Sequence, residues 1–345
     1  MFIEEKIAKS LFSDILEYFK YAETKPLIEL DGAGVHWYCK VNIKSIKVSV
    51  KSCDISYLKG NQGPTEEFII SYFRNDKEVA CGRTSNRVNL IGSIDLWLNS
   101  KSKEQLYLKY DFVDHDLRTV ENLEKTWIKK FPELGNISRV LEHTGSGIVR
   151  YQISNKDRSC WTTGFGHQGE LYFGFVWDGC LIFETESIRR ETAEVLKRYL
   201  IDREAPSSLN KEFSWIPINN LTESYEKGKG IEGEFIESWE LSLLFYKRFP
   251  ETSLPDKNKI IKLIHGLKDQ GFNKTIRAGT SLTRLILSRS RRHGLMENQP
   301  FMNFAFVNNK IHLSTKNGKI YILDKIQLTP GLIEQIKELE KEDIN

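Results

Sequence analysis

The feature that most constrains this chain is a succession of short apolar runs separated only by turn residues. Between Ile148 and Glu186 four such runs follow one another: IVRYQIS, SCWTTGF, ELYFGFVW and CLIFETE. Turn signals, notably HQG and DG, separate them. Strands that succeed one another in hairpins, rather than alternating with helices, favour an α+β fold over a parallel sheet. We therefore expect antiparallel sheets flanked by helices, in a multi-domain chain.

The N-terminal third repeats this mixture of helices and short strands. Residues 3–20 place apolar side chains on one helical face, which predicts an amphipathic helix. Residues 27–84 contain the β-rich runs VHWYCKVNI, SIKVSV and EFIISYF, which predict a small antiparallel sheet. Residues 88–131 turn helical again and end at Pro132. The core candidates of this helical segment are Trp97, Leu98, Leu106 and Trp127.

The C-terminal half is expected to be mainly helical, with one small sheet. Ser187 can cap a helix that runs to about Ile201, and further helices extend to residue 293. The runs FMNFAFV, KIHLS and KIYILD predict a small meander, and Thr329-Pro330 begins a last helix. Breaks near Pro132 and Pro250 predict three domains: an N-terminal α+β domain (1–133), a central β-meander with helices (134–250), and a C-terminal domain with a basic helix, a meander and a terminal helix (251–345).

Composition excludes several classes of protein. The 345 residues are 40% hydrophobic and 28% charged, which is typical of a folded chain and not of a disordered one. The net charge of +3 is too small for bulk attraction to a polyanion, so any basic site must be local. Acids near the N-terminus argue against a secretory signal, and the longest apolar runs fall far short of the roughly 18 residues that a membrane helix needs. We expect a cytoplasmic protein without a membrane partner.

The five cysteines contain no CxxC pair and leave one over if paired. Neither a zinc site nor a disulfide framework is indicated. No phosphate-binding or dinucleotide-binding glycine motif is present. We expect no metal and no cofactor.

The stretch TSLTRLILSRSRRHGL, from Thr280 to Leu295, is chemically unusual. Six cations and no acid lie between Gly271 and Met296. If the stretch is a helix, Arg284, Ser288, Arg291 and Arg292 share one face, where guanidinium forks and a hydroxyl suit phosphate oxygens. The residues expected to bind an anion or nucleic acid are Lys274, Arg277, Arg284, Ser288, Arg289, Arg291, Arg292 and His293.

An ordinary helix end explains part of the same pattern. Thr280 or Ser281 can cap the start, Gly294 can end the helix, and cations in the last turn complement the helix dipole. Stabilising the helix dipole requires only one or two cations, whereas the stretch has four arginines. The additional arginines favour a bound ligand. Arg289 falls within the apolar arc, where it needs a buried acid or a groove wall.

Two acidic segments are the alternatives. The segment YDFVDHDLR contains Asp111, Asp114, His115 and Asp116, which could hold Mg²⁺ or act in acid-base catalysis, although Asp114 or Asp116 could equally cap a helix. The segment from Tyr225 to Glu240 carries five glutamates. These stabilise a helix start, or one of them neutralises Arg289 or binds a basic partner.

The phrases YDFVDHDLR, DRSC, APSSL, FSWIPI, YEKGKGIEGEF and TIRAGTSLTRLILSRSRRHGL together resemble an uncharacterised bacterial protein family over most of the chain beyond about residue 80. The resemblance implies a bacterial, soluble origin. It implies no activity, cofactor or catalytic residue.

Three functions are therefore open. The first is a non-enzymatic binding protein whose basic helix engages an anionic partner, most directly nucleic acid. The second is a subunit of a bacterial complex that docks on an acidic protein surface. The third is a metal-dependent hydrolase or nuclease that uses the acidic cluster; enzymatic activity stays open, with the balance against it.

Overall fold

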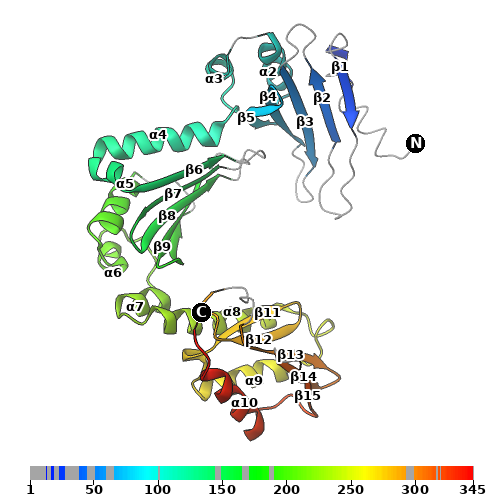
Figure 1. The fold of residues 1–345 in the computed structure, drawn as a ribbon, viewed down its shortest axis with the longest axis vertical. Helices are drawn as coiled ribbons and strands as arrows, with labels where there is room; N and C mark the ends of the chain where they lie inside the picture. The colour runs from blue at the N-terminus through cyan, green and yellow to red at the C-terminus, as the bar shows by residue number, and fades with distance from the viewer. Residues whose placement is uncertain are drawn as a thin grey trace. The chain divides into compact units, whose positions relative to one another are not determined.

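In the computed structural model, groups of helices alternate with antiparallel sheets (Figure 1). The structure describes residues 13, 17–18, 23–27, 39–44, 51–59, 66–99, 102–143, 149–164, 171–185, 190–292, 299–315, 318 and 320–344. The strands among these residues form three antiparallel sheets, in each of which strands consecutive in sequence are hydrogen-bonded neighbours. The predicted α+β fold with antiparallel sheets is confirmed.

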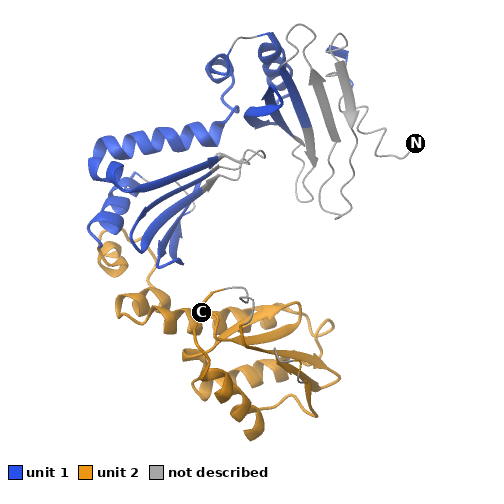
Figure 2. Ribbon diagram, viewed as in Figure 1, with its two compact units in different colours: residues 1–203 blue, residues 204–345 orange. Residues whose placement is uncertain are grey.

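The chain divides into two compact units, Met1–Arg203 and Glu204–Asn345 (Figure 2). The sequence placed boundaries after residues 133 and 250. That three-part division stays a prediction.

The first sheet of unit 1 is a meander followed by two helices. Its elements are β1 (Glu23–Leu27), β2 (Cys39–Lys44), β3 (Lys51–Lys59), β4 (Glu66–Arg74), β5 (Lys77–Thr84), α2 (Arg87–Asn99) and α3 (Glu104–Lys109). Tyr72 on β4 and Trp97 on α2 pack edge to face with ring centroids 6.0 Å apart. Trp97, Leu98 and Leu106 are buried, as predicted. Most of the helix predicted at residues 3–20 lies outside the described residues.

The second sheet of unit 1 follows one long helix. Its elements are α4 (His115–Lys130), η1 (Pro132–Asn136), β6 (Ser138–His143), β7 (Val149–Asn155), β8 (Arg158–Gly164), β9 (Leu171–Trp177), β10 (Cys180–Thr185), α5 (Thr192–Leu196) and η2 (Lys197–Ile201). Trp127 of α4 is buried, as predicted, and packs against Phe173 of β9 at 5.7 Å between centroids. The predicted cap, Ser187, lies outside the described residues.

Unit 2 contains a helical layer and the third sheet. Its elements are α6 (Pro206–Asn210), α7 (Asn220–Glu226), α8 (Gly230–Arg248), α9 (Lys257–Asp269), η3 (Phe272–Lys274), β11 (Arg277–Ser281), β12 (Arg284–Ser288), β13 (Phe301–Val307), β14 (Lys310–Thr315), β15 (Ile320–Leu323) and α10 (Pro330–Glu340). Trp239 and Tyr246 of α8 share one buried core with Phe304 of β13. The predicted meander and last helix are confirmed, and the Thr329 hydroxyl caps α10 by accepting from the Leu332 N–H at 3.3 Å.

The helix predicted around Arg284 is wrong, because residues 277–288 form the hairpin of β11 and β12. Ser281 pairs with Arg284 across a two-residue turn, in which Leu282 adopts a left-handed φ of 54°. Leu285 and Leu287 are fully buried while Ile286 between them is only half-buried, which is the period of a strand. A short apolar run fits either period, and the turn contains no glycine or asparagine to mark it.

Candidate functional site

The hairpin scatters the cations that a helix would have aligned. Arg284 is exposed at the start of β12, whereas Ser288 at its end is buried, with its hydroxyl accepting from the Ser290 N–H at 3.3 Å. Lys274 and Arg292 are exposed outside the two strands, and His293 lies outside the described residues. The predicted single row of guanidinium groups on a helix face is therefore absent from the part of the chain that the structure describes.

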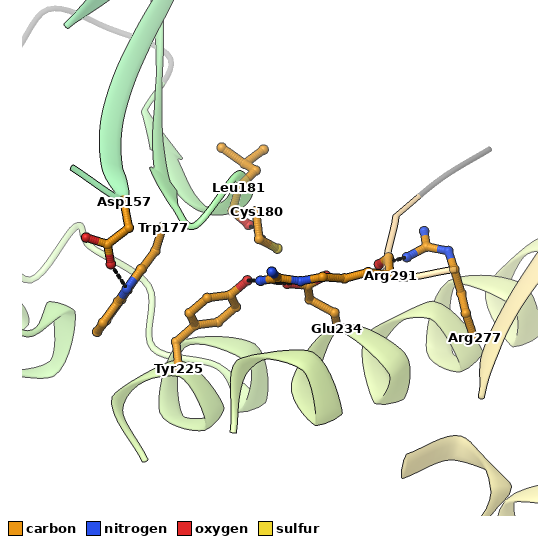
Figure 3. Close-up of polar contacts among 8 residues, drawn as sticks. All are labelled: Asp157, Trp177, Cys180, Leu181, Tyr225, Glu234, Arg277 and Arg291. Atoms are coloured by element: carbon orange, nitrogen blue, oxygen red, sulfur yellow. Dashed lines mark hydrogen bonds and ion pairs between the residues drawn. The ribbon is translucent and has the colours of Figure 1, made fainter. Parts of the chain in front are cut away.

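Arg291 binds an acid of the chain itself. Its Nη2 and Nε donate to the Glu234 Oε1 of α8 at 2.9 and 3.1 Å, and its Nη2 also donates to the Tyr225 hydroxyl at 3.2 Å (Figure 3). The Tyr225 hydroxyl in turn makes a short hydrogen bond to the same carboxylate oxygen. The Glu234 side chain is only 4% exposed, so this carboxylate depends on its partners for charge compensation. We name Tyr225, Glu234 and Arg291 the Glu234 cluster.

Two further arginines donate to backbone carbonyls. Arg289 donates through Nε to the Glu342 carbonyl at 2.8 Å and through Nη1 to the Thr275 carbonyl. Arg277 donates through Nη1 to the Arg291 carbonyl at 3.0 Å. The expectation that one of the glutamates neutralises Arg289 is thus wrong. The glutamate Glu234 binds Arg291 instead. Arg289 connects the segment after α10 to the segment before β11 through its two backbone contacts.

The acidic cluster of unit 1 is built around Asp114. Its backbone N–H donates to the Cys81 carbonyl at 2.7 Å, and its Oδ1 accepts from the Cys81 N–H at 2.8 Å. Its Oδ2 accepts from the Tyr107 hydroxyl at 2.5 Å. Burial, and secondarily Asp114, raise the pKa of both the Cys81 thiol and the Tyr107 phenol. These contacts fasten the loop before α4 to β5.

The other members of this cluster do not converge on a metal. Asp111 is exposed, and His115 lies 3.3 Å from the buried Asp116, whose hydrogen bond raises the pKa of His115. Asp114 occupies the N-cap position of α4 without making a capping bond. Within the described ranges, no three His, Cys, Asp or Glu side chains are placed to hold a metal ion. The catalytic role of these four residues stays a prediction.

A groove of about 620 Å³ lies between the C-terminal half of α8 and the edge strand β11. We name it the α8–β11 groove. Its volume is within the range of roughly 300–1,000 Å³ that is typical of ligand-binding clefts. Its helical wall consists of Ser238, Leu241, Ser242, Leu244, Phe245 and Arg248 of α8 with Phe249 and Pro250 directly after the helix, and its strand wall consists of Arg277, Ala278, Gly279 and Thr280.

The lining of the groove is mainly apolar, with three hydroxyl side chains, two cations and no acid. Leu241 and Leu244 are 56% and 44% exposed, respectively, although both are leucines on a well-formed helix. Arg248 is exposed at the end of α8. A partner that fits this lining is apolar and carries negative charge.

Our sequence interpretation missed this groove, although α8 contained a signal for it. Trp239, Leu243 and Tyr246 face the core. Leu241 and Leu244 form a second, exposed apolar stripe on another side of the helix, whereas a surface helix normally has one stripe; Phe245 both lines the groove and packs against the core. The run LSLLFY, residues 241–246, contains members of both stripes.

The comparisons with known proteins leave the site to be interpreted from its geometry. The chain matches no protein-family model, and no curated protein or solved structure matches it. Among the described residues, no helix is both long enough and apolar enough to cross a membrane.

Proposed function

We propose that the chain is a non-catalytic binding subunit that docks an acidic protein partner in the α8–β11 groove of unit 2. The observation that carries the proposal is the exposure of Leu241 and Leu244 beside Arg248, in a groove that contains no acid. Contiguous exposed apolar surface next to charge is the usual composition of a protein-docking site.

The fate of the other candidates supports this choice. Arg291 binds Glu234, and the two carboxylate oxygens of Asp114 accept hydrogen bonds from the Cys81 N–H and the Tyr107 hydroxyl. The four cysteines whose side chains the structure describes form no disulfide bond with one another, which fits the cytoplasmic location that we propose.

The test is a comparison of two matched double variants of the full chain. Leu241→Glu/Leu244→Glu charges the groove, and Ile320→Glu/Ile322→Glu charges β15 at the opposite edge of the same sheet, where both isoleucines are also exposed. Each tagged protein is incubated with nuclease-treated extract of its own source cells and chemically cross-linked. We expect a protein cross-linked to the unmodified chain and to the β15 variant, but not to the groove variant. Identical cross-links in all three would refute the proposal.

Nucleic acid is the second candidate partner, and the exposure of Lys274, Arg284 and Arg292 favours it. Phosphate contacts from such cations give binding that weakens steeply with salt. The Arg284→Glu/Arg292→Glu variant leaves Arg291 in place and so tests this candidate without disturbing the Glu234 cluster. Retention on heparin and on single-stranded DNA that is equal in this variant and in the unmodified chain would eliminate nucleic acid as a partner of these residues.

A further inference from the structure

The outer edge of β11 carries backbone groups that point away from its own sheet. β11 is the first strand in the order β11-β12-β13-β14-β15, so among the described residues it pairs with β12 alone. Ser281 and Arg284 flank the two-residue turn and form a hydrogen-bonded pair, as do Gly279 and Ile286 two residues further on. Thr280, which lies between these two pairs, and Ala278, on the other side of Gly279, therefore direct their N–H and C=O groups outward.

A contact with α8 confirms this assignment. The Ala278 N–H donates to the Ser238 hydroxyl of α8 at 3.0 Å, which is possible only if it points away from β12. Ser238 is buried and small, so α8 comes close to β11 at this position. The outward carbonyl of Ala278 and both outward groups of Thr280 lie further along the strand, and both residues line the groove.

The groove thus combines a strand edge with an apolar helical wall. Leu241, Leu244 and Phe245 recur on α8 at the spacing of one helical face opposite this edge. Unpaired strand edges pair readily with another extended chain, and alternate side chains of that chain then face the same way. Arg248 stands at the end of this wall and is exposed, and Arg277 of β11 is the other cation of the lining.

From this geometry we infer that the α8–β11 groove binds an extended segment of another protein as an additional strand beside β11, with apolar side chains against α8 and an acidic side chain at Arg248. The inference rests on the proposed function, because it names the form that the docked partner takes. Three outward backbone groups of β11 bond to the backbone of the segment. The carbonyls of Ala278 and Thr280 each accept a hydrogen bond from an N–H of the segment, and the Thr280 N–H donates one to a carbonyl of the segment.

The probe is a selected peptide of known sequence. A phage-displayed library of random peptides of about 12 residues, longer than the strand they are to pair with, is panned on the immobilised full chain. We expect enriched peptides with apolar residues at alternate positions and an aspartate or glutamate near one end. Failure to enrich any peptide, or enrichment of apolar residues at helical spacing, would overturn the inference.

The decisive measurement is an N-methyl scan of one enriched peptide, because methylation removes a single N–H donor. We expect methylation of alternate amides to weaken binding by about tenfold or more, and methylation of the intervening amides, which point away from β11, to change it by less than about threefold. Affinities are measured by fluorescence anisotropy. A loss that does not alternate would overturn strand addition.

Variants of the protein locate the peptide. Leu241→Glu/Leu244→Glu is expected to weaken binding about tenfold or more, and Arg248→Glu about two- to fivefold, as for one exposed ion pair. The Ile320→Glu/Ile322→Glu control is expected to bind as the unmodified chain does. Equal binding by the groove variant would overturn the inference.

The outcomes separate the inference from the proposed function. Cross-linking that is lost in the groove variant, together with an N-methyl scan that shows no alternation, would support the proposed docking function and refute strand addition beside β11. A dimer of the full chain that light scattering shows to dissociate in the groove variant would reject both in favour of a second copy as the occupant.

Discussion

The two halves of α8 use their side chains in opposite ways. Near its start, Glu234 is buried and is satisfied by Tyr225 and Arg291 of the same unit. Toward its end, Leu241 and Leu244 are exposed beside the outward edge of β11. The conspicuous charges of the sequence therefore hold the fold together, while inconspicuous leucines face the groove. Residue type alone does not separate these roles, because what decides is whether the chain supplies a partner.

The largest expected effect separates the two halves by stability. Glu234→Ala leaves the Arg291 guanidinium, whose side chain is only 20% exposed, without its acid. We expect the free energy of unfolding to fall by about 3–5 kcal/mol, the usual cost of breaking a buried pair. Urea denaturation followed by tryptophan fluorescence measures it.

A matched control lies on the same helix. Glu240 of α8 pairs with Lys268 at 2.5 Å while half-exposed, so Glu240→Ala should cost less than about 1 kcal/mol. Equal losses in the two variants would mean that the Glu234 cluster is no more important to the fold than a surface pair.

The groove variant should show the reverse pattern. Leu241→Glu/Leu244→Glu exchanges two exposed side chains, so we expect each change to alter the free energy of unfolding by no more than about 0.5 kcal/mol. Binding of a selected peptide should nevertheless fall about tenfold. Thermal unfolding and anisotropy on the same preparation measure both. A large loss of stability would show instead that the leucines support the core.

The sign of one substitution tests the hairpin itself. Leu282 is 84% exposed and has a φ of 54°, which costs a leucine about 1–2 kcal/mol. We therefore expect Leu282→Gly to stabilise the protein by about 0.5–1 kcal/mol, after the entropic cost of glycine. In a helix the same change would destabilise by about 1 kcal/mol. Thermal unfolding that shows destabilisation would favour the helix that the sequence predicts.

The smallest effect concerns pH. The hydrogen bond from His115 to Asp116 raises the pKa of His115 above its unfolded value. A raised pKa contributes stability that is present below the unfolded value and is lost as the pH rises through the folded one. Because His115 is about half-exposed, the contribution is small. Between about pH 5 and 8, His115→Gln should flatten the decline of the melting temperature, and an unchanged slope would remove His115 as its source.

The sequence predicted the parts of the fold that local pattern controls. The sheets, the core position of Trp97 and the start of the last helix at Thr329-Pro330 depend on alternation, burial and a proline in the first helical position, and all three are confirmed. The hairpin of β11 and β12 escaped prediction because Leu282 takes a turn conformation that glycine or asparagine normally marks.

The candidate site was less accessible to sequence reasoning. The acid that compensates Arg291 lies 57 residues away on α8, and no spacing rule connects two such positions. The α8–β11 groove likewise depends on α8 packing beside an edge strand, which only the tertiary structure reveals. Local arginine density predicted an external anion because the chain's own acid was distant in sequence.

The most direct test of the account compares two double variants in one binding assay. Leu241→Glu/Leu244→Glu alters the groove, and Arg284→Glu/Arg292→Glu alters the exposed cations. The cross-linked partner should be lost in the first and kept in the second. Loss of the cross-linked partner in the arginine variant, with its retention in the leucine variant, would contradict the account and would show that the exposed cations bind the partner.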